Sequence, residues 1–150
     1  MERVALWIPL VVGASALAVT IVTHALAVAG TVHFVRRQRR VGHAGAGFWT
    51  DVAIVAVAIS FALGAHLLDI GVWALLLMGC GEFDAFGTAY YHSAVNYTTL
   101  GYGDVIMTPS WRFLGPLEAV NGFILFGVST AIIIALIHHV IQVRFPDLWT

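Results

Sequence analysis

The sequence predicts an all-α membrane protein, with three transmembrane helices and a short re-entrant helix followed by a loop. Hydrophobic residues make up 60% of the 150-residue chain and charged residues only 10%, and the mean hydropathy is +0.91. Three segments, each longer than the ~20 apolar residues that a spanning helix needs, are almost free of charge. A soluble domain of this size needs far more charge to cover its surface. The surplus of apolar residues is therefore expected to face lipid.

The three predicted spans cover residues 4–35, 52–80 and 113–143. In the second span, His66 and Asp69 are three residues apart and so share one helix face. Ionisable residues inside a membrane are functional candidates. At about 1.5 Å per residue, however, Asp69 lies about 27 Å along the helix from Asp51. This places Asp69 near the outer interface, where its carboxylate reaches water, and favours a structural anchoring role.

Basic residues gather on one side of the predicted membrane. Arg36, Arg37, Arg39 and Arg40 lie in a predicted loop after the first span, and Arg144 follows the third. Short basic loops stay in the cytoplasm. We therefore expect the N-terminus outside, and residues 36–40 and the C-terminus inside. Next to two long apolar segments, the arginine cluster indicates membrane topology rather than nucleic-acid binding, so no nucleic-acid partner is expected.

The segment between the second and third spans, residues 81–112, is too apolar and aromatic for a simple loop. Residues 85–97 contain no proline and predict a helix of three turns, which is too short to span the membrane. A short apolar helix in this place indicates an element that dips into the membrane and returns. Its apolar and aromatic residues, with one just before it, are Phe83, Phe86, Tyr90, Tyr91, Val95 and Tyr97.

The sequence TTLGYGD follows immediately at residues 98–104. Glycine adopts backbone dihedrals that other residues avoid, and alternating such residues can point successive carbonyls the same way. Non-helical backbone at membrane depth is tolerated only where it is buried in protein or lines a water-filled cavity. A run of aligned carbonyls facing a cavity is a ladder of oxygen ligands for a cation. The alternative is an outer-loop turn, since glycines also mark turns.

Residues 99–104 resemble the selectivity filter of the potassium channel family. Residues 51–143 also match the order of its bacterial-type pore domain, which is outer helix, pore helix, filter and inner helix. The resemblance implies a pore domain at residues 51–150, preceded at residues 1–50 by an extra transmembrane helix and its arginine-rich loop. It further implies a homotetramer in the lipid bilayer of a bacterial inner or plasma membrane. K⁺ would be the permeant ion, with no organic cofactor.

The resemblance also implies roles for single residues of the filter. Thr99 would offer its hydroxyl and carbonyl to the innermost K⁺ site, and the next three carbonyls would form the sites above it. The ring of Tyr102 would point away from the ion path and pack against the pore helix. Leu100 stands where the family commonly has valine. The implied filter comprises Thr98, Thr99, Leu100, Gly101, Tyr102 and Gly103, of which Thr99, Leu100, Gly101 and Tyr102 would bind K⁺.

Residues around the filter are expected to support it. Asp104 would bond to Tyr91 or His92 on the pore helix behind it. Val95 occupies the position where some relatives carry an acidic residue, so a carboxyl pair with Asp104 is absent. Glu118, near the outer start of the third span, is expected to brace the back of the filter.

The third span carries two further expectations. Glycine in a helix is costly, and the resemblance places a gating hinge near Gly122, with Gly127 five residues later. The alternative is close helix packing at a small residue. Thr130, Ile134 and His138 recur at four-residue steps and would line the cavity down to the inner mouth. There His138 is a candidate pH sensor, or alternatively a cap on the helix end.

The leading interpretation is a passive potassium channel and not an enzyme. Two alternatives keep the fold: a weakly selective cation channel, in which Leu100 loosens the filter, and a non-conducting scaffold with a relic filter. A third is a redox enzyme with histidine ligands. No pair among His24, His33, His138 and His139 has the four-residue helical spacing of a metal site. The filter sequence also argues against the last two alternatives.

Overall fold

The computed structural model describes residues 7–43 and 45–145, and within these ranges every regular element is a helix. The elements are α1 (Trp7–Arg40), α2 (Phe48–Gly79), α3 (Phe86–Tyr97) and α4 (Leu114–Arg144). Helices α1, α2 and α4 are long and apolar enough to cross a membrane, which confirms the predicted fold class. The short α3 occupies the place predicted for the re-entrant helix.

Helix α1 continues through the arginine cluster, so the loop predicted at residues 36–40 is wrong. Arginine is a good helix former, and positive side chains are favourable at the carboxyl end of a helix. Arg37, Arg39 and Arg40 lie in its last turn. The connection to α2 is therefore the short stretch at residues 41–47, of which residue 44 is outside the description.

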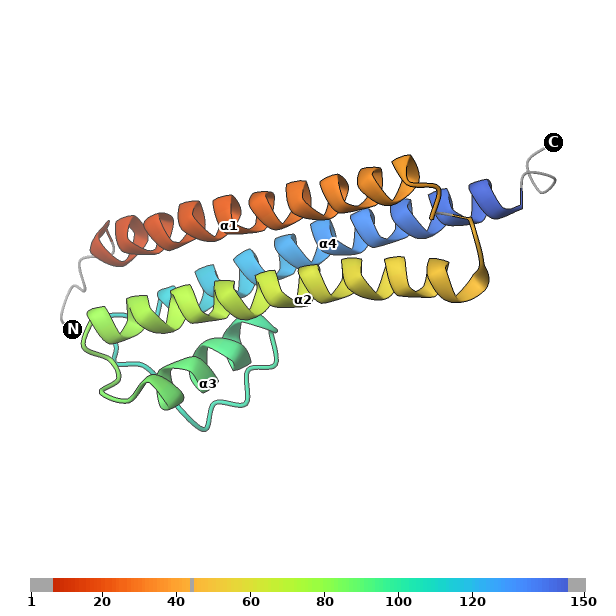
Figure 1. Ribbon diagram of the computed structural model, residues 1–150. Coiled ribbons are helices and arrows are strands. Elements are labelled where there is room, and N and C mark those ends of the chain that lie inside the picture. The colour runs from red at the N-terminus through yellow and green to blue at the C-terminus, as the bar shows by residue number, and fades with distance from the viewer. Residues whose placement is uncertain (1–6, 44, 146–150) are drawn as a thin grey trace.

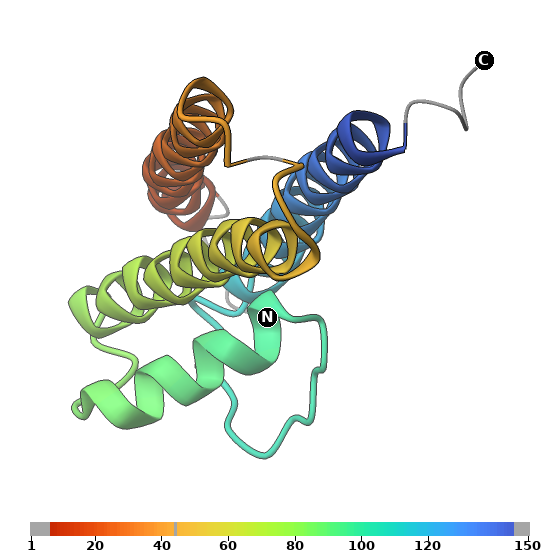
Figure 2. The same cartoon turned by 45° about the vertical axis from the view of Figure 1, so that its right-hand side comes forward.

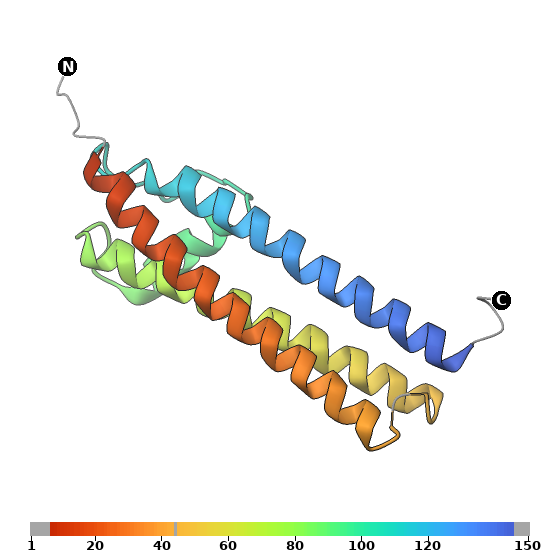
Figure 3. The same cartoon turned by 90° about the horizontal axis from the view of Figure 1, so that it is seen from above.

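The three long helices run side by side, and α3 lies against α2 and α4 near the end of the bundle where α1 begins (Figures 1 and 3). Seen from a second angle, α3 and the loop after it project from the side of α2 that faces away from α1 (Figure 2). Helix α1 packs on α2 and α4. Helices α3 and α1 are thus on opposite sides of a central α2–α4 pair.

Helix α1 turns a stripe of small and polar residues toward its neighbours, which the sequence alone did not reveal. Small residues let membrane helices approach closely, and polar ones bond across the contact. The Thr20 hydroxyl donates to Asn121 Oδ1 at 2.9 Å, and Trp73 Nε1 donates to the same oxygen at 2.9 Å. These bonds tie α1, α2 and α4 together. The buried residues of α1 are Pro9, Gly13, Ala16, Thr20, His24 and Thr31.

The helices also meet at both ends of the bundle. Trp73, Leu77 and Tyr97 pack with Leu114 in one apolar core beside α3. At the far end, Arg144 donates to Asp51 across 2.9 Å. Long apolar side chains on the outer faces remain exposed in the single chain, as expected of surfaces that meet lipid or further chains.

Candidate functional site

The carboxyl end of α3 turns directly into the predicted filter. The Thr98 hydroxyl donates to the Ala94 carbonyl at 2.7 Å and closes the last turn. The Val95 carbonyl then accepts the backbone N–H groups of Leu100 at 2.9 Å and Gly101 at 3.2 Å. Since these bonds satisfy the carbonyls at the helix end, the chain leaves α3 in a defined direction. Val95, itself buried, thus contacts the segment after α3 through its carbonyl oxygen.

Positive φ angles alternate along the filter segment. Thr99 has φ 60°, Gly101 has φ 61° and Gly103 has φ 71°. Glycine takes this conformation without strain, as the sequence predicted for two of the three positions. Threonine does not, and a non-glycine residue there costs on the order of 1–3 kcal/mol, a strain that concentrates at functional sites. The strained Thr99 was not foreseen from the sequence.

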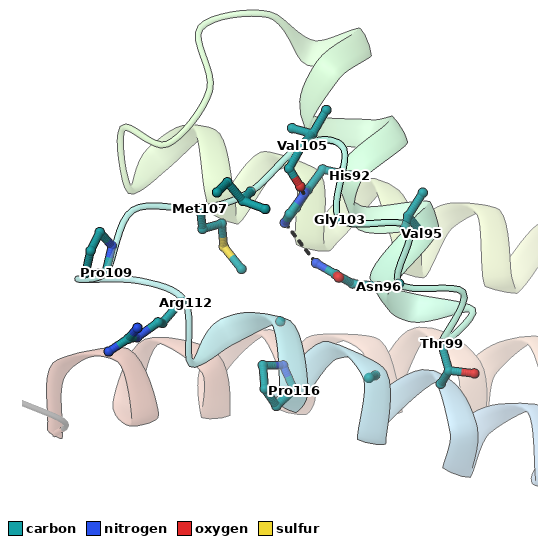
Figure 4. Close-up of a pocket in the computed structure, with 14 residues that line it drawn as sticks. His92, Val95, Asn96, Thr99, Gly103, Val105, Met107, Pro109, Arg112 and Pro116 are labelled. Carbon is teal, nitrogen blue, oxygen red and sulfur yellow. Dashed lines mark hydrogen bonds between the residues drawn. The ribbon is translucent and has the colours of Figure 1, made fainter.

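The filter side chains are exposed on the single chain. Leu100 is 53% exposed and Tyr102 is 67% exposed. The ring of Tyr102 is thus largely uncovered by its own pore helix, and the expected packing against a pore helix requires a neighbour. A hollow of about 690 Å³ lies beside the filter, between the loop that follows it and the first turns of α4 (Figure 4).

A network of hydrogen bonds holds the loop after the filter to α3. The Tyr91 hydroxyl donates to Asp104 Oδ2 at 2.7 Å, which confirms one of the two predicted partners of Asp104. The other, His92, instead donates from Nδ1 to the Val105 carbonyl at 2.9 Å, while its Nε2 accepts from Asn96 Nδ2 at 2.8 Å (Figure 4). Burial lowers the pKa of His92, which agrees with a neutral ring that donates once and accepts once.

Glu118 is fully buried against α3, with Ser93 and Asn96 as polar neighbours. Within the described part of the chain, its carboxyl oxygens and the Ser93 hydroxyl have no hydrogen-bond partner. Glu118 thus faces α3, and its role as a brace behind the filter stays a prediction.

Gly122 lies where α4 passes the end of α3. A Cβ built at this position would come within 2.0 Å of the Tyr97 carbonyl oxygen. At Gly127 a Cβ would meet nothing within 4 Å. Close packing therefore explains why residue 122 is a glycine. The hinge, the other explanation, stays a prediction. Thr130, Ile134 and His138 are all exposed on one side of α4.

The structure also gathers residues that the sequence left apart. His24 of α1 joins His66 and Asp69 of α2, with one ligand atom from each lying within 4.8 Å of the others. Asp69 is fully buried, so the expectation that it reaches water is wrong, because α1 covers it. Helical spacing could not reveal this group, since its histidines come from different helices. Polar residues inside apolar spans were the available signal.

Comparison with known families shows to which protein family the chain belongs. The model of a family described as ion channel matches residues 52–139, which cover α2, α3, the filter segment and most of α4. No curated protein and no solved structure matches the chain. The matched region begins after α1, and the division into a pore unit and an additional helix stays a prediction.

Proposed function

Since the chain belongs to the ion-channel family whose model matches residues 52–139, we propose that it forms a potassium-selective channel with residues 99–103 as the selectivity filter. The alternation of positive φ at Thr99, Gly101 and Gly103 carries this proposal. Alternation in the sign of φ turns successive peptide groups so that their carbonyl oxygens lie on one side of the strand. Such a column of carbonyls replaces the hydration shell of K⁺.

The proposed channel is a tetramer of identical chains. One chain supplies one strand of the filter, and four strands complete the ring of oxygens. The exposed side chains of Leu100 and Tyr102 support this assembly, since exposed apolar surface of this kind marks a contact. The hollow beside the filter offers space for side chains of a neighbouring subunit.

The test is ion flux through the purified full-length chain in liposomes. We expect K⁺ to leave loaded vesicles rapidly and Na⁺ to leave slowly under the same gradient. Equal fluxes would favour the weakly selective cation channel. Absence of both fluxes, from protein that is tetrameric and inserted, would favour the scaffold. An absorbance spectrum of the same sample checks the redox alternative.

The orientation follows from the basic residues. The arginines at the end of α1 lie beside the last part of α4, where Arg36, Arg39 and His139 border one pocket. Basic segments stay on the cytoplasmic side and attract anionic lipid head groups. We place this end of the bundle in the cytoplasm and the filter mouth outside. The proposed location is a bacterial inner or plasma membrane.

Asp104 should respond to acid in a way that depends on Tyr91. The hydrogen bond from Tyr91 holds the pKa of Asp104 below its usual range, so the carboxylate stays charged to lower pH and keeps attracting K⁺ to the mouth. Tyr91→Phe should raise this pKa toward the ordinary value of an exposed aspartate. As the pH at the filter mouth is lowered, single-channel current should therefore fall at a higher pH in Tyr91→Phe than in the wild type.

Tyr90→Phe is the matched control, because the Tyr90 hydroxyl donates to the Leu67 carbonyl at 3.1 Å and not to Asp104. Its acid profile should equal that of the wild type. Identical profiles for Tyr91→Phe and the wild type would show that this hydrogen bond does not control the charge at the mouth.

A further inference from the structure

Five buried side chains form a closed ring of hydrogen bonds. Tyr97 donates to Asp69 Oδ2 at 3.2 Å, and the same oxygen lies 3.2 Å from His24 Nδ1. His24 Nε2 lies 2.8 Å from Ser129 Oγ, which is 3.0 Å from His66 Nε2. His66 Nδ1, at 3.0 Å from the Tyr97 hydroxyl, closes the ring. All five residues are buried.

The ring connects all four helices. His24 comes from α1, His66 and Asp69 from α2, Tyr97 from α3 and Ser129 from α4. Tyr97 is the last residue of the pore helix, two positions before the strained Thr99. The side chain that ends the pore helix is therefore bound, through Asp69, to the helix that lies farthest from it.

Counting protons shows that the ring acts as a unit. Five hydrogen bonds need five protons, whereas one carboxylate, two neutral imidazoles and two hydroxyls carry four. A ring in which all five bonds are made therefore carries one more proton than this count, and that proton brings its net charge to zero. Since an uncompensated charge inside a protein is costly, the neutral and fully bonded ring is the favourable state. Removing one member breaks two of its bonds.

A bound metal ion is a poorer account of the same group. Both nitrogens of His24 and both nitrogens of His66 are already engaged in the ring. Within the described residues, Asp69 Oδ1 is the one ligand atom of the three side chains without a hydrogen-bond partner. Closed hydrogen bonding explains the convergence of these groups without an ion.

We propose that His24 of α1 is a positioning residue for the selectivity filter. By binding Asp69 and Ser129 it completes the ring that fixes the Tyr97 hydroxyl, and Tyr97 fixes the end of α3 from which the filter starts. Tyr97 and His24 both bond to the same oxygen of Asp69, so losing one bond changes the position and charge of the group that the other bond engages. The extra helix thereby contributes to ion discrimination without touching the pore. This inference rests on the proposed function.

The test is the K⁺ to Na⁺ permeability ratio of single full-length channels in planar bilayers, measured from the reversal potential. This ratio is a property of each open pore and does not depend on how much protein folds. For His24→Ala we expect it to fall roughly tenfold, the effect of losing a hydrogen bond to a charged group. His24→Asn, whose amide can still donate to Asp69, should recover part of the ratio.

His33→Ala is the matched control, because His33 lies on the same helix but is exposed. It should keep the wild-type ratio. Tyr97→Phe and Ser129→Ala each remove one hydroxyl of the ring and should also lower the ratio. The double variant His24→Ala/Tyr97→Phe should lower it no further than Tyr97→Phe alone, since both act through Asp69.

A wild-type ratio in conducting His24→Ala channels would overturn the inference. If His24→Ala yields no tetramers, unchanged ratios in both Tyr97→Phe and Ser129→Ala would overturn it instead. These failures differ from failure of the proposed function, which shows in the wild type. A wild-type chain that does not conduct, or does not prefer K⁺, removes the proposed function and this inference together.

Discussion

Replacing Gly101 by alanine is expected to abolish potassium conduction while the chain still inserts and assembles. An added Cβ at Gly101 meets nothing within 4 Å in the single chain, so the effect arises from the backbone angle, φ 61°. A residue with a Cβ loses on the order of 1–3 kcal/mol in this conformation, and in the proposed tetramer this cost arises four times in one filter. The peptide group should turn to relieve the strain and misalign the carbonyls. Gly103→Ala, at φ 71°, should behave alike.

Liposome flux together with size-exclusion chromatography checks this prediction. Gly87→Ala is the matched control, because Gly87 lies in α3 with open space around its Cα and alanine favours a helix more than glycine does. It should conduct as the wild type does. Normal K⁺ flux through Gly101→Ala tetramers would remove the assignment of the filter.

Gly122→Ala should destabilise the assembled chain and lower its selectivity. The new Cβ would lie 2.0 Å from the Tyr97 carbonyl oxygen and 2.9 Å from its carbonyl carbon. Both are backbone atoms, so α4 and the end of α3 must move apart, and overpacking of this kind costs about 1–3 kcal/mol or more. Because the filter begins two residues after Tyr97, the displacement should reach it. Thermal unfolding in detergent and the reversal potential measure the two effects.

The control is Gly127→Ala on the same helix, where an added Cβ meets nothing within 4 Å. This variant should unfold at or above the wild-type temperature and keep its selectivity. A stable Gly122→Ala channel with reduced opening and unchanged selectivity would instead support the hinge predicted from the sequence. The comparison therefore separates packing from bending at this glycine.

The elements of the fold were predictable because each depends on local sequence. Charge-free runs longer than a membrane is thick indicate spanning helices, and the predicted ends differ from the observed ones by a few residues. The short helix at residues 85–97 was recognisable as apolar, free of proline and too short to span. The clear error, the loop at residues 36–40, has a local cause as well. The positive charges indicate that residues 36–40 lie outside the membrane, but they do not exclude a helix there, because arginine is a good helix former.

The filter was predictable in part. Glycine at positions 101 and 103 indicates positive φ angles, because glycine adopts them without steric cost. The bond from Tyr91 to Asp104 was one of two expected partners. The positive φ of Thr99 could not be predicted from its residue type, since backbone hydrogen bonds at the end of α3 impose it.

The contacts between segments far apart in the chain could not be predicted from the sequence. Spacing within a helix tells which side chains share a face, but it does not tell which faces of different helices meet. His24 and Asp69 are 45 positions apart, and Gly122 meets Tyr97 only because α4 crosses the end of α3. Composition and local pattern therefore establish a membrane protein with a filter-like loop. The pairing of helix faces, set by packing and by the need to bond buried polar groups, connects α1 and its histidine through Asp69 to the helix that precedes that loop.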